Sequence, residues 1–163
     1  MINKQVASVE EAVADVFDGA TVMVSGFGEA GSPIELLHAL IDQGATDLTV
    51  VNNNTGSGEI GLAALIKAGR VAKMICSYPR TTNSTVFPEL YRSGRLELEL
   101  VPQGTLAERI RAGGAGIPAF YTQTAVGTPL EEGHERRTFN GSDYLLVYGL
   151  TADFALIKGR AAD

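Results

Sequence analysis

The chain has 163 residues, of which 45% are hydrophobic, and its formal net charge is −6. This length is typical of one domain with a buried core, while the absence of a basic block argues against nucleic-acid binding. No apolar run approaches the ~20 residues of a membrane span, and the first residues lack the apolar core of a signal peptide. We therefore expect a cytoplasmic protein that binds neither nucleic acid nor membrane.

The first two thirds of the chain alternate between helical and extended patterns. A capping box formed by Ser8 and Glu11 starts a helix that Asp18-Gly19 stops. Further segments follow in the same rhythm: a strand over 20–25, a helix from 33 to 43, a strand over 48–51, a helix over 60–68, a strand over 72–77, a helix over 83–92, a strand over 96–101 and a helix over 105–112. The alternation of Leu with Glu in 96–101 indicates a half-exposed strand or one near a sheet edge.

The rhythm changes after Ile117. The segment 139–142 has the composition of a hairpin turn, and we expect 144–147 and 154–158 to be strands of a smaller antiparallel or mixed part. The charged stretch 127–138 is predicted to be a mobile surface loop. The predicted fold is therefore α/β, with a mostly parallel open sheet, helices on both faces and a small antiparallel or mixed C-terminal part. We expect a single domain over 1–163, incomplete at its C-terminus because the last strand has nothing to pair with afterwards.

The sequence offers few residues for thiol or metal chemistry. Cys76 is the only cysteine, and its apolar neighbours predict a buried structural thiol, not a nucleophile. His38 and His134 stand far apart in the sequence, so no metal site is expected. No nucleophile has an evident base near it in the sequence, which suggests that a catalytic group is supplied from outside this chain.

Three glycines follow the strand predicted over 20–25. Gly26, Gly28 and Gly31 precede Ser32-Pro33, which starts a helix, so the loop lies where backbone N–H groups and the helix dipole favour an anion. The spacing also matches a dinucleotide-binding fingerprint. That fingerprint requires an acidic residue about 20 positions further on, where this chain has asparagines. Anion binding and a simple tight turn remain open alternatives here.

Other polar loops are expected at the same edge of the sheet. Asn52 and Asn53 follow the second strand, where they either form a turn or line the glycine loop with amide donors. Tyr78 and Arg80 follow the third strand, and a structural turn competes with a contact between Arg80 and a substrate carboxylate. Gln103 follows the fourth strand. Its amide can donate to an oxyanion, although spacing alone favours a helix-entry residue.

Two segments resemble signatures of a known family. The stretch from Asp18-Gly19 through Gly26-Phe27 to Gly31-Ser32-Pro33, and the block 102–121, are similar to sequences in the A (alpha) subunit of the family I coenzyme A transferases. This family includes the 3-oxoacid and 3-oxoadipate CoA-transferases. The segments 77–80 and 86–92 look most like the 3-oxoadipate branch.

The resemblance implies a ping-pong transfer of CoA from succinyl-CoA to 3-oxoadipate or another 3-oxo acid. In the family, the acyl-CoA is attacked by a glutamate that lies in a Ser-Glu-Asn-Gly context on the B (beta) subunit. This chain has no such motif, so it would need a B subunit. Gln103 matches the family's oxyanion-stabilising glutamine. The CoA thioester would be a substrate, and no cofactor or metal is expected. The expected substrate-binding or CoA-binding residues are Gly26, Phe27, Gly28, Gly31, Asn52, Asn53, Tyr78 and Arg80.

The chain departs from the family pattern at Ser25, which stands where the first of two glycines is usual. Serine fits this position if its φ is negative. Members of the family also continue well past the point that corresponds to residue 163. Two alternatives to the transferase are a non-catalytic sensor that binds a small phosphorylated or acyl ligand, and a dinucleotide-binding domain.

Overall fold

The computed structural model describes residues 4–81 and 83–161, which fall into two compact units. Unit 1 comprises Met1–Glu99 and Ala152–Asp163, and unit 2 comprises Leu100–Thr151. These two units are groups of residues in mutual contact. Whether they unfold together as the single expected domain stays a prediction. Among the described residues, the helices are too short or too polar to span a lipid bilayer.

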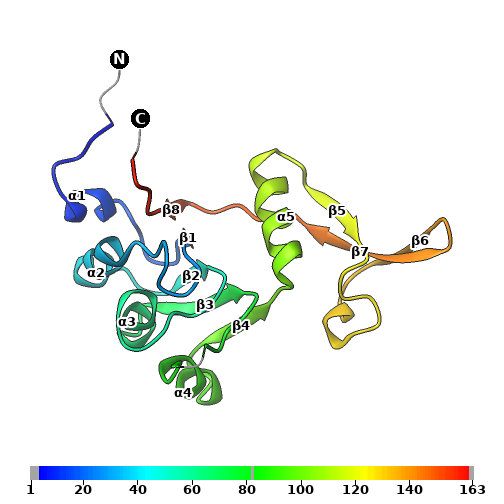
Figure 1. Ribbon diagram of the computed structural model, residues 1–163, viewed down its shortest axis with the longest axis horizontal. Helices are drawn as coiled ribbons and strands as arrows, with labels where there is room; N and C mark the ends of the chain where they lie inside the picture. The colour runs from blue at the N-terminus through cyan, green and yellow to red at the C-terminus, as the bar shows by residue number, and fades with distance from the viewer. Residues whose placement is uncertain (1–3, 82, 162–163) are drawn as a thin grey trace. The chain divides into compact units, whose positions relative to one another are not determined.

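A five-stranded sheet forms the centre of unit 1 (Figure 1). Its strand order is β4-β3-β2-β1-β8, and β1 pairs in parallel with both β2 and β8, as does β2 with β3. The expected mostly parallel sheet is therefore confirmed, with β4 at an edge as the Leu–Glu alternation predicts. The strands are β1 (Thr21–Val24), β2 (Leu48–Val51), β3 (Val71–Cys76), β4 (Glu97–Leu100) and β8 (Phe154–Leu156).

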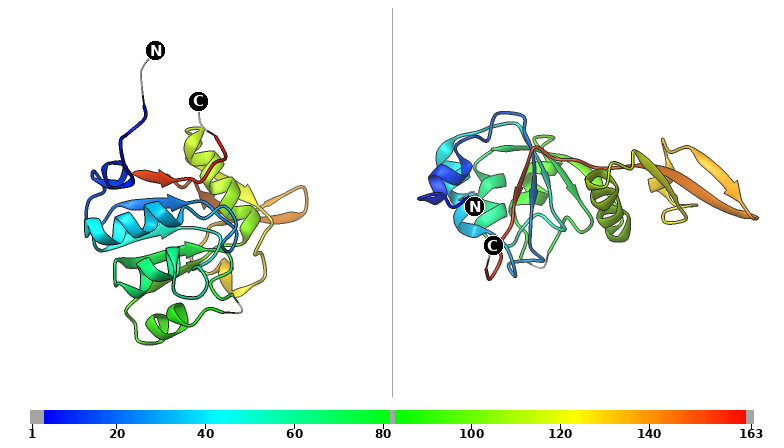
Figure 2. Two further views of the ribbon diagram at one scale, coloured as in Figure 1. Left: turned by 60° about the vertical axis from the view of Figure 1, so that its left-hand side comes forward. Right: turned by 90° about the horizontal axis from the view of Figure 1, so that it is seen from above.

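Four helices of unit 1 follow one another in a row (Figure 2). They are α1 (Val9–Val13), α2 (Ile34–Gln43), α3 (Gly61–Lys67) and α4 (Val86–Arg92). Strands β1 to β4 are laid down in one direction across the sheet, and right-handed crossovers then bring the connecting helices to the same face. The sequence predicts helices on both faces of the sheet, and the four helices of unit 1 lie on one face.

The core of unit 1 lies between these helices and the sheet. Leu37 and Leu40 of α2 are fully buried because residues three apart lie on one side of a helix, and Leu65 and Ile66 of α3 are fully buried in the same core. The strands contribute a further set of fully buried side chains: Val22, Leu48, Val50 and Met74. This burial holds the strand ends in fixed positions.

The capping box predicted at the start of the chain is present. Ser8 Oγ accepts a hydrogen bond from the Glu11 N–H at 3.2 Å. The Glu11 carboxylate reaches back to the backbone, where it accepts from the Ala7 N–H at 2.8 Å. The helix is shorter than expected and ends at Val13.

The expected position of the last strand was wrong. The sequence pattern places segment 154–158 in the small antiparallel or mixed part, whereas β8 joins the main sheet in parallel with β1. The register places Val22 opposite Phe154, and the side chain of Asp153 accepts a hydrogen bond from the Thr21 N–H at 2.8 Å. Parallel pairing is non-local, so the sequence of this short strand does not reveal its partner.

Unit 2 contains one long helix and a three-stranded antiparallel sheet of order β5-β7-β6. Asn140 and Gly141 both have positive φ, as a two-residue hairpin turn between β6 and β7 requires. This confirms the predicted turn over 139–142. The elements are α5 (Gln103–Gly114), β5 (Ala119–Thr122), the 3-10 helix η1 (Pro129–Glu131), β6 (Arg136–Phe139) and β7 (Ser142–Tyr148).

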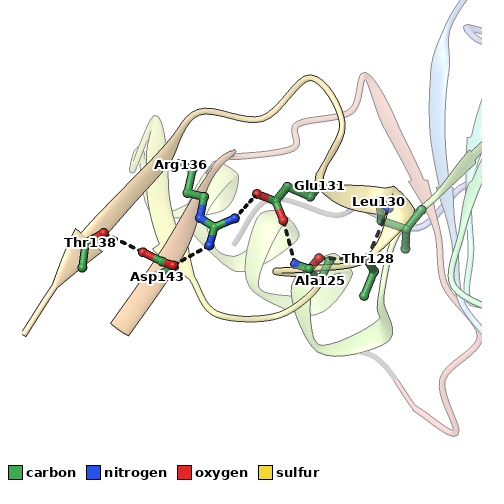
Figure 3. A network of polar contacts seen from close by, with 8 residues as sticks. Ala125, Thr128, Leu130, Glu131, Arg136, Thr138 and Asp143 are labelled. Carbon is green, nitrogen blue, oxygen red and sulfur yellow. Dashed lines mark hydrogen bonds and ion pairs between the residues drawn. The ribbon is translucent and has the colours of Figure 1, made fainter. Parts of the chain in front are cut away.

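The stretch predicted as a mobile loop over 127–138 contains η1 and most of β6, so it is ordered. Arg136 pairs with both Glu131 and Asp143, and the latter also accepts from the Thr138 hydroxyl (Figure 3). Glu131 in turn accepts from the Gly127 N–H at 2.6 Å. The charges that suggested a solvated loop instead join β6 and β7 to η1.

Candidate functional site

Loops that follow neighbouring strands meet at the carboxyl edge of the unit 1 sheet. The loop after β2 and the loop after β3 are joined because the Ser77 and Tyr78 N–H groups both donate to the Asn53 carbonyl. The loops after β1 and β2 line a common small pocket. The pocket residues are Gly28, Glu29, Ser32, Ile34, Asn52, Asn54, Gly56, Ser57, Ile60, Gly61 and Leu62.

The glycine loop after β1 is a tight turn. The Phe27 N–H donates to the Ala30 carbonyl at 2.9 Å, and Gly26, Gly28 and Gly31 all have positive φ. A Cβ at Gly26 would lie 3.0 Å from the Ser32 backbone nitrogen, so both space and conformation require glycine there. The Phe27 side chain is 69% exposed, which leaves its ring free to contact a bound molecule.

Asn52 joins the glycine loop to the next loop from a buried position. Its Nδ2 donates to the Val24 carbonyl at 2.7 Å and to the Ser25 carbonyl at 3.3 Å. Its Oδ1 accepts from the Asn54 N–H at 2.9 Å. Because these bonds occupy the amide, Asn52 shapes the pocket wall; direct contact with substrate stays a prediction.

Asn53 is less buried and makes simpler contacts. Its Oδ1 accepts a hydrogen bond from Ser77 Oγ at 2.8 Å. Its side-chain NH₂ group makes no recorded hydrogen bond to any of the described residues. The NH₂ group is thus available as the amide donor that the sequence suggested for this loop.

Several pocket residues were not identified from the sequence as site residues. Ser32 and Asn54 are both buried and line the pocket. The Gly61 N–H, at the start of α3, donates to His38 Nε2 of α2 at 3.1 Å. His38 therefore fixes the end of the loop after β2, where that loop enters α3. A polar residue at a helix start was the available signal for Ser32, whereas the contact of His38 depends on how α2 packs beside α3.

Tyr78 and Arg80 lie at the exposed end of the loop after β3. The Tyr78 side chain is 61% exposed and Arg80 is also exposed. The structure brings the Tyr78 backbone to Asn53, as described above, but records no side-chain contact between Arg80 and the other predicted site residues. Their roles in binding a carboxylate stay predictions.

Gln103 begins α5, immediately after Pro102, and belongs to unit 2. Its side chain is exposed, and among the described residues its amide makes no recorded hydrogen bond. The helix extends from Gln103 to Gly114, longer than the predicted 105–112. An exposed amide at a helix N-terminus can donate to a developing negative charge without first breaking an internal bond.

Cys76 ends β3 with its side chain fully buried. Burial raises the pKa of its thiol to about 12. A thiol of that kind stays protonated at neutral pH and is a poor nucleophile, which agrees with the predicted structural role.

Comparison with known proteins decides the family. The coenzyme A transferase family model matches residues 6–163. The chain belongs to the coenzyme A transferase family. It is 56% identical over its whole length to the A subunit of 3-oxoadipate CoA-transferase from Pseudomonas putida, of which it spans 71%. It is 52% identical to the protein of the same name from Acinetobacter baylyi, of which it spans 72%.

The fold is similar to that of a solved structure. The acyl-CoA transferase YdiF from Escherichia coli O157:H7, in its apoenzyme form, superposes with a TM-score of 0.80 at 24% identity. The match covers 93% of this chain and 33% of that chain. The family membership favours a transferase over the two alternatives, a sensor and a dinucleotide-binding domain.

Proposed function

We propose that this chain is the A subunit of a heteromeric CoA-transferase that moves CoA from succinyl-CoA to 3-oxoadipate or another 3-oxo acid. The observation that carries the proposal is the 56% identity, over all 163 residues, to the A subunit of a 3-oxoadipate CoA-transferase. The relatives are named as subunits of a larger enzyme, which supports a partner B subunit.

The chemistry proposed for the complex divides between the two chains. A glutamate of the B subunit, in a Ser-Glu-Asn-Gly context, attacks the thioester carbonyl of succinyl-CoA and displaces the CoA thiolate to form an acyl anhydride. The thiolate then attacks the glutamyl carbonyl of the anhydride, which releases succinate and leaves a glutamyl-CoA thioester. The acceptor carboxylate finally takes the CoA by the same two steps in reverse.

Gln103 has the role of oxyanion donor in this scheme. Each attack produces a tetrahedral centre with a negatively charged oxygen, and a donor that forms its bond only there lowers the barrier. The exposed, unengaged amide at the start of α5 supports this assignment. The glycine loop would contribute a surface that a substrate can approach closely, with Phe27 beside it. CoA is a substrate here, and the proposal requires no separate cofactor.

The test is a CoA exchange assay on the chain co-expressed with a candidate B subunit. Wild type should transfer CoA from succinyl-CoA to 3-oxoadipate only when both chains are present. Gln103→Ala should lower kcat by about 100-fold, the usual effect of losing one oxyanion donor. Gln103→Glu, which keeps the shape but replaces the NH₂ donor by a carboxylate oxygen, should be at least as damaging.

Gln123→Ala is the matched control, because Gln123 is another exposed glutamine of unit 2. It should keep wild-type kinetics. Equal losses at both positions, or a Gln103→Ala enzyme with wild-type kcat, would contradict the role of Gln103. A stable complex without transfer to any 3-oxo acid would contradict the proposed reaction.

A further inference from the structure

The Ser25 hydroxyl makes two hydrogen bonds that join separate parts of unit 1. Its Oγ donates to the Gly31 carbonyl at 2.7 Å, which closes the two ends of the glycine loop. The same atom accepts from the Lys158 N–H at 3.0 Å, on the segment that leaves β8. The φ angle of Ser25 itself is not positive, so a residue with a side chain fits this position without backbone strain.

Ser25 is itself held from two other directions. Its N–H donates to the Leu156 carbonyl of β8 at 2.9 Å, and its carbonyl accepts from Asn52 Nδ2 at 3.3 Å. The residue therefore stands between the last strand, the glycine loop and the loop after β2. Because Ser25 is held at the end of β1, its hydroxyl fixes the Gly31 carbonyl and the Lys158 N–H relative to the sheet.

The glycine loop needs such an anchor. Gly26 and Gly31 stand at its two ends, and glycine restricts the backbone less than any other residue. Phe27 at its tip is mostly exposed, so packing of that side chain does little to hold the loop. The internal bond from Phe27 to Ala30 shapes the turn but does not tie it to the sheet.

We propose that Ser25 is a positioning residue whose hydroxyl fastens the glycine loop to the strand end and to the segment after β8. It thereby sets Gly28 and Glu29 against Asn52 and Asn54 in the pocket that these residues line. The part of this inference that concerns substrate rests on the proposed function. The fastening itself concerns only this chain.

The test compares three variants with wild type in the two-chain enzyme. Ser25→Ala removes both hydrogen bonds of the hydroxyl, and Ser25→Thr keeps a hydroxyl. Ser93→Ala is the matched control, because Ser93 Oγ also donates to one carbonyl, that of Leu90, and accepts one N–H, from Arg95, but lies at the end of α4.

Amide hydrogen exchange and kinetics are both measured. Ser25→Ala should speed exchange at Lys158 and over 26–32 about fivefold, the factor expected for one lost hydrogen bond. It should raise KM for succinyl-CoA by a similar factor while kcat changes less than about twofold. Ser25→Thr should restore both values, and Ser93→Ala should alter neither.

The inference is overturned if Ser25→Ala leaves exchange at both segments unchanged, or if Ser93→Ala has the same effect on them. Altered exchange with unchanged KM overturns the role in substrate positioning. If the wild-type pair transfers no CoA, the proposed function fails, and the exchange measurements still decide whether Ser25 fastens the loop.

Discussion

The adjacent residues Asn52 and Asn53 differ in burial and in their side-chain hydrogen bonds. Asn52 is 6% exposed and uses both ends of its amide on backbone groups of β1 and its own loop. Asn53 is more exposed, and its recorded side-chain bond is to the Ser77 hydroxyl. The sequence does not distinguish the two asparagines. Because Asn52 is more buried, its hydrogen bonds should contribute more to the free energy of unfolding.

Replacement by alanine should separate the two roles. Asn52→Ala leaves buried backbone groups without partners, so the free energy of unfolding should fall by about 2 kcal/mol. Asn53→Ala should cost about 0.5 kcal/mol, since Ser77 can still donate to the Asn53 carbonyl. Urea unfolding measures both values. Similar losses for the two variants would show that the bonds of Asn52 are not the stabilising ones.

At the scale of elements, a network of charges organises η1, β6 and β7. Arg136 is the centre, with Glu131 on one side and Asp143 on the other (Figure 3). The pKa of Glu131 is lowered, first by the Gly127 N–H and then by Arg136, and the pKa of Asp143 is lowered by Thr138 and Arg136. Both carboxyls therefore stay ionised to lower pH in the folded chain than in the unfolded chain.

The sign of this linkage gives a pH prediction. A carboxyl with a lowered folded pKa adds stability above its unfolded pKa, and that stability disappears as the pH falls through the folded value. Exchange protection at the Gly127 amide should thus persist at about pH 4.3, where an ordinary glutamate is half protonated, and be lost only at lower pH.

Neighbouring arginines provide the control for this network. Arg136→Ala should abolish the protection of Gly127 even at about pH 6, well above the range in which an ordinary glutamate titrates, whereas Arg137→Ala should preserve it. Arg137 lies instead over the Tyr121 ring, 5.6 Å from its centre. Loss of protection in both variants would assign the effect to general charge, not to the contacts of Arg136.

At the scale of the whole molecule, unit 1 is built from both ends of the sequence. The chain forms β1 to β4 in order, passes through unit 2 and returns to place β8 beside β1. Unit 2 has few buried apolar side chains in its own residues: Val101, Leu106, Ala112, Leu145 and Val147. We expect so small a core to leave unit 2 unable to fold as a separate domain.

We therefore expect one unfolding transition for 1–163. Far-UV circular dichroism follows the whole chain, and Tyr121, Tyr144 and Tyr148 make tyrosine absorbance a probe weighted toward unit 2. The two probes should give the same urea midpoint, as a two-state transition requires. A separate earlier transition in tyrosine absorbance would show that the two units are distinct folding domains.

The secondary-structure elements of unit 1 follow from local features of the sequence. Apolar runs, glycine stops and capping residues located β1 to β4 and the helices between them, since these features depend on neighbours along the chain. The signature around Gly26-Phe27 and the block that contains Gln103 indicated the family for the same reason, because both are contiguous stretches of residues.

Contacts between residues far apart in the chain become visible only in the folded structure. The pairing of β8 with β1, the bonds of Asn52 to β1 and the two bonds of Ser25 all join residues that are not neighbours in the sequence. Such contacts depend on the register of parallel strands and on the packing of helices beside them, neither of which any single segment encodes. The sequence supplied Asn52, Asn53 and Gln103 as candidates. The fold separated the buried Asn52 from the other two, whose NH₂ groups make no recorded bond to the described residues, and added the contacts of Ser25.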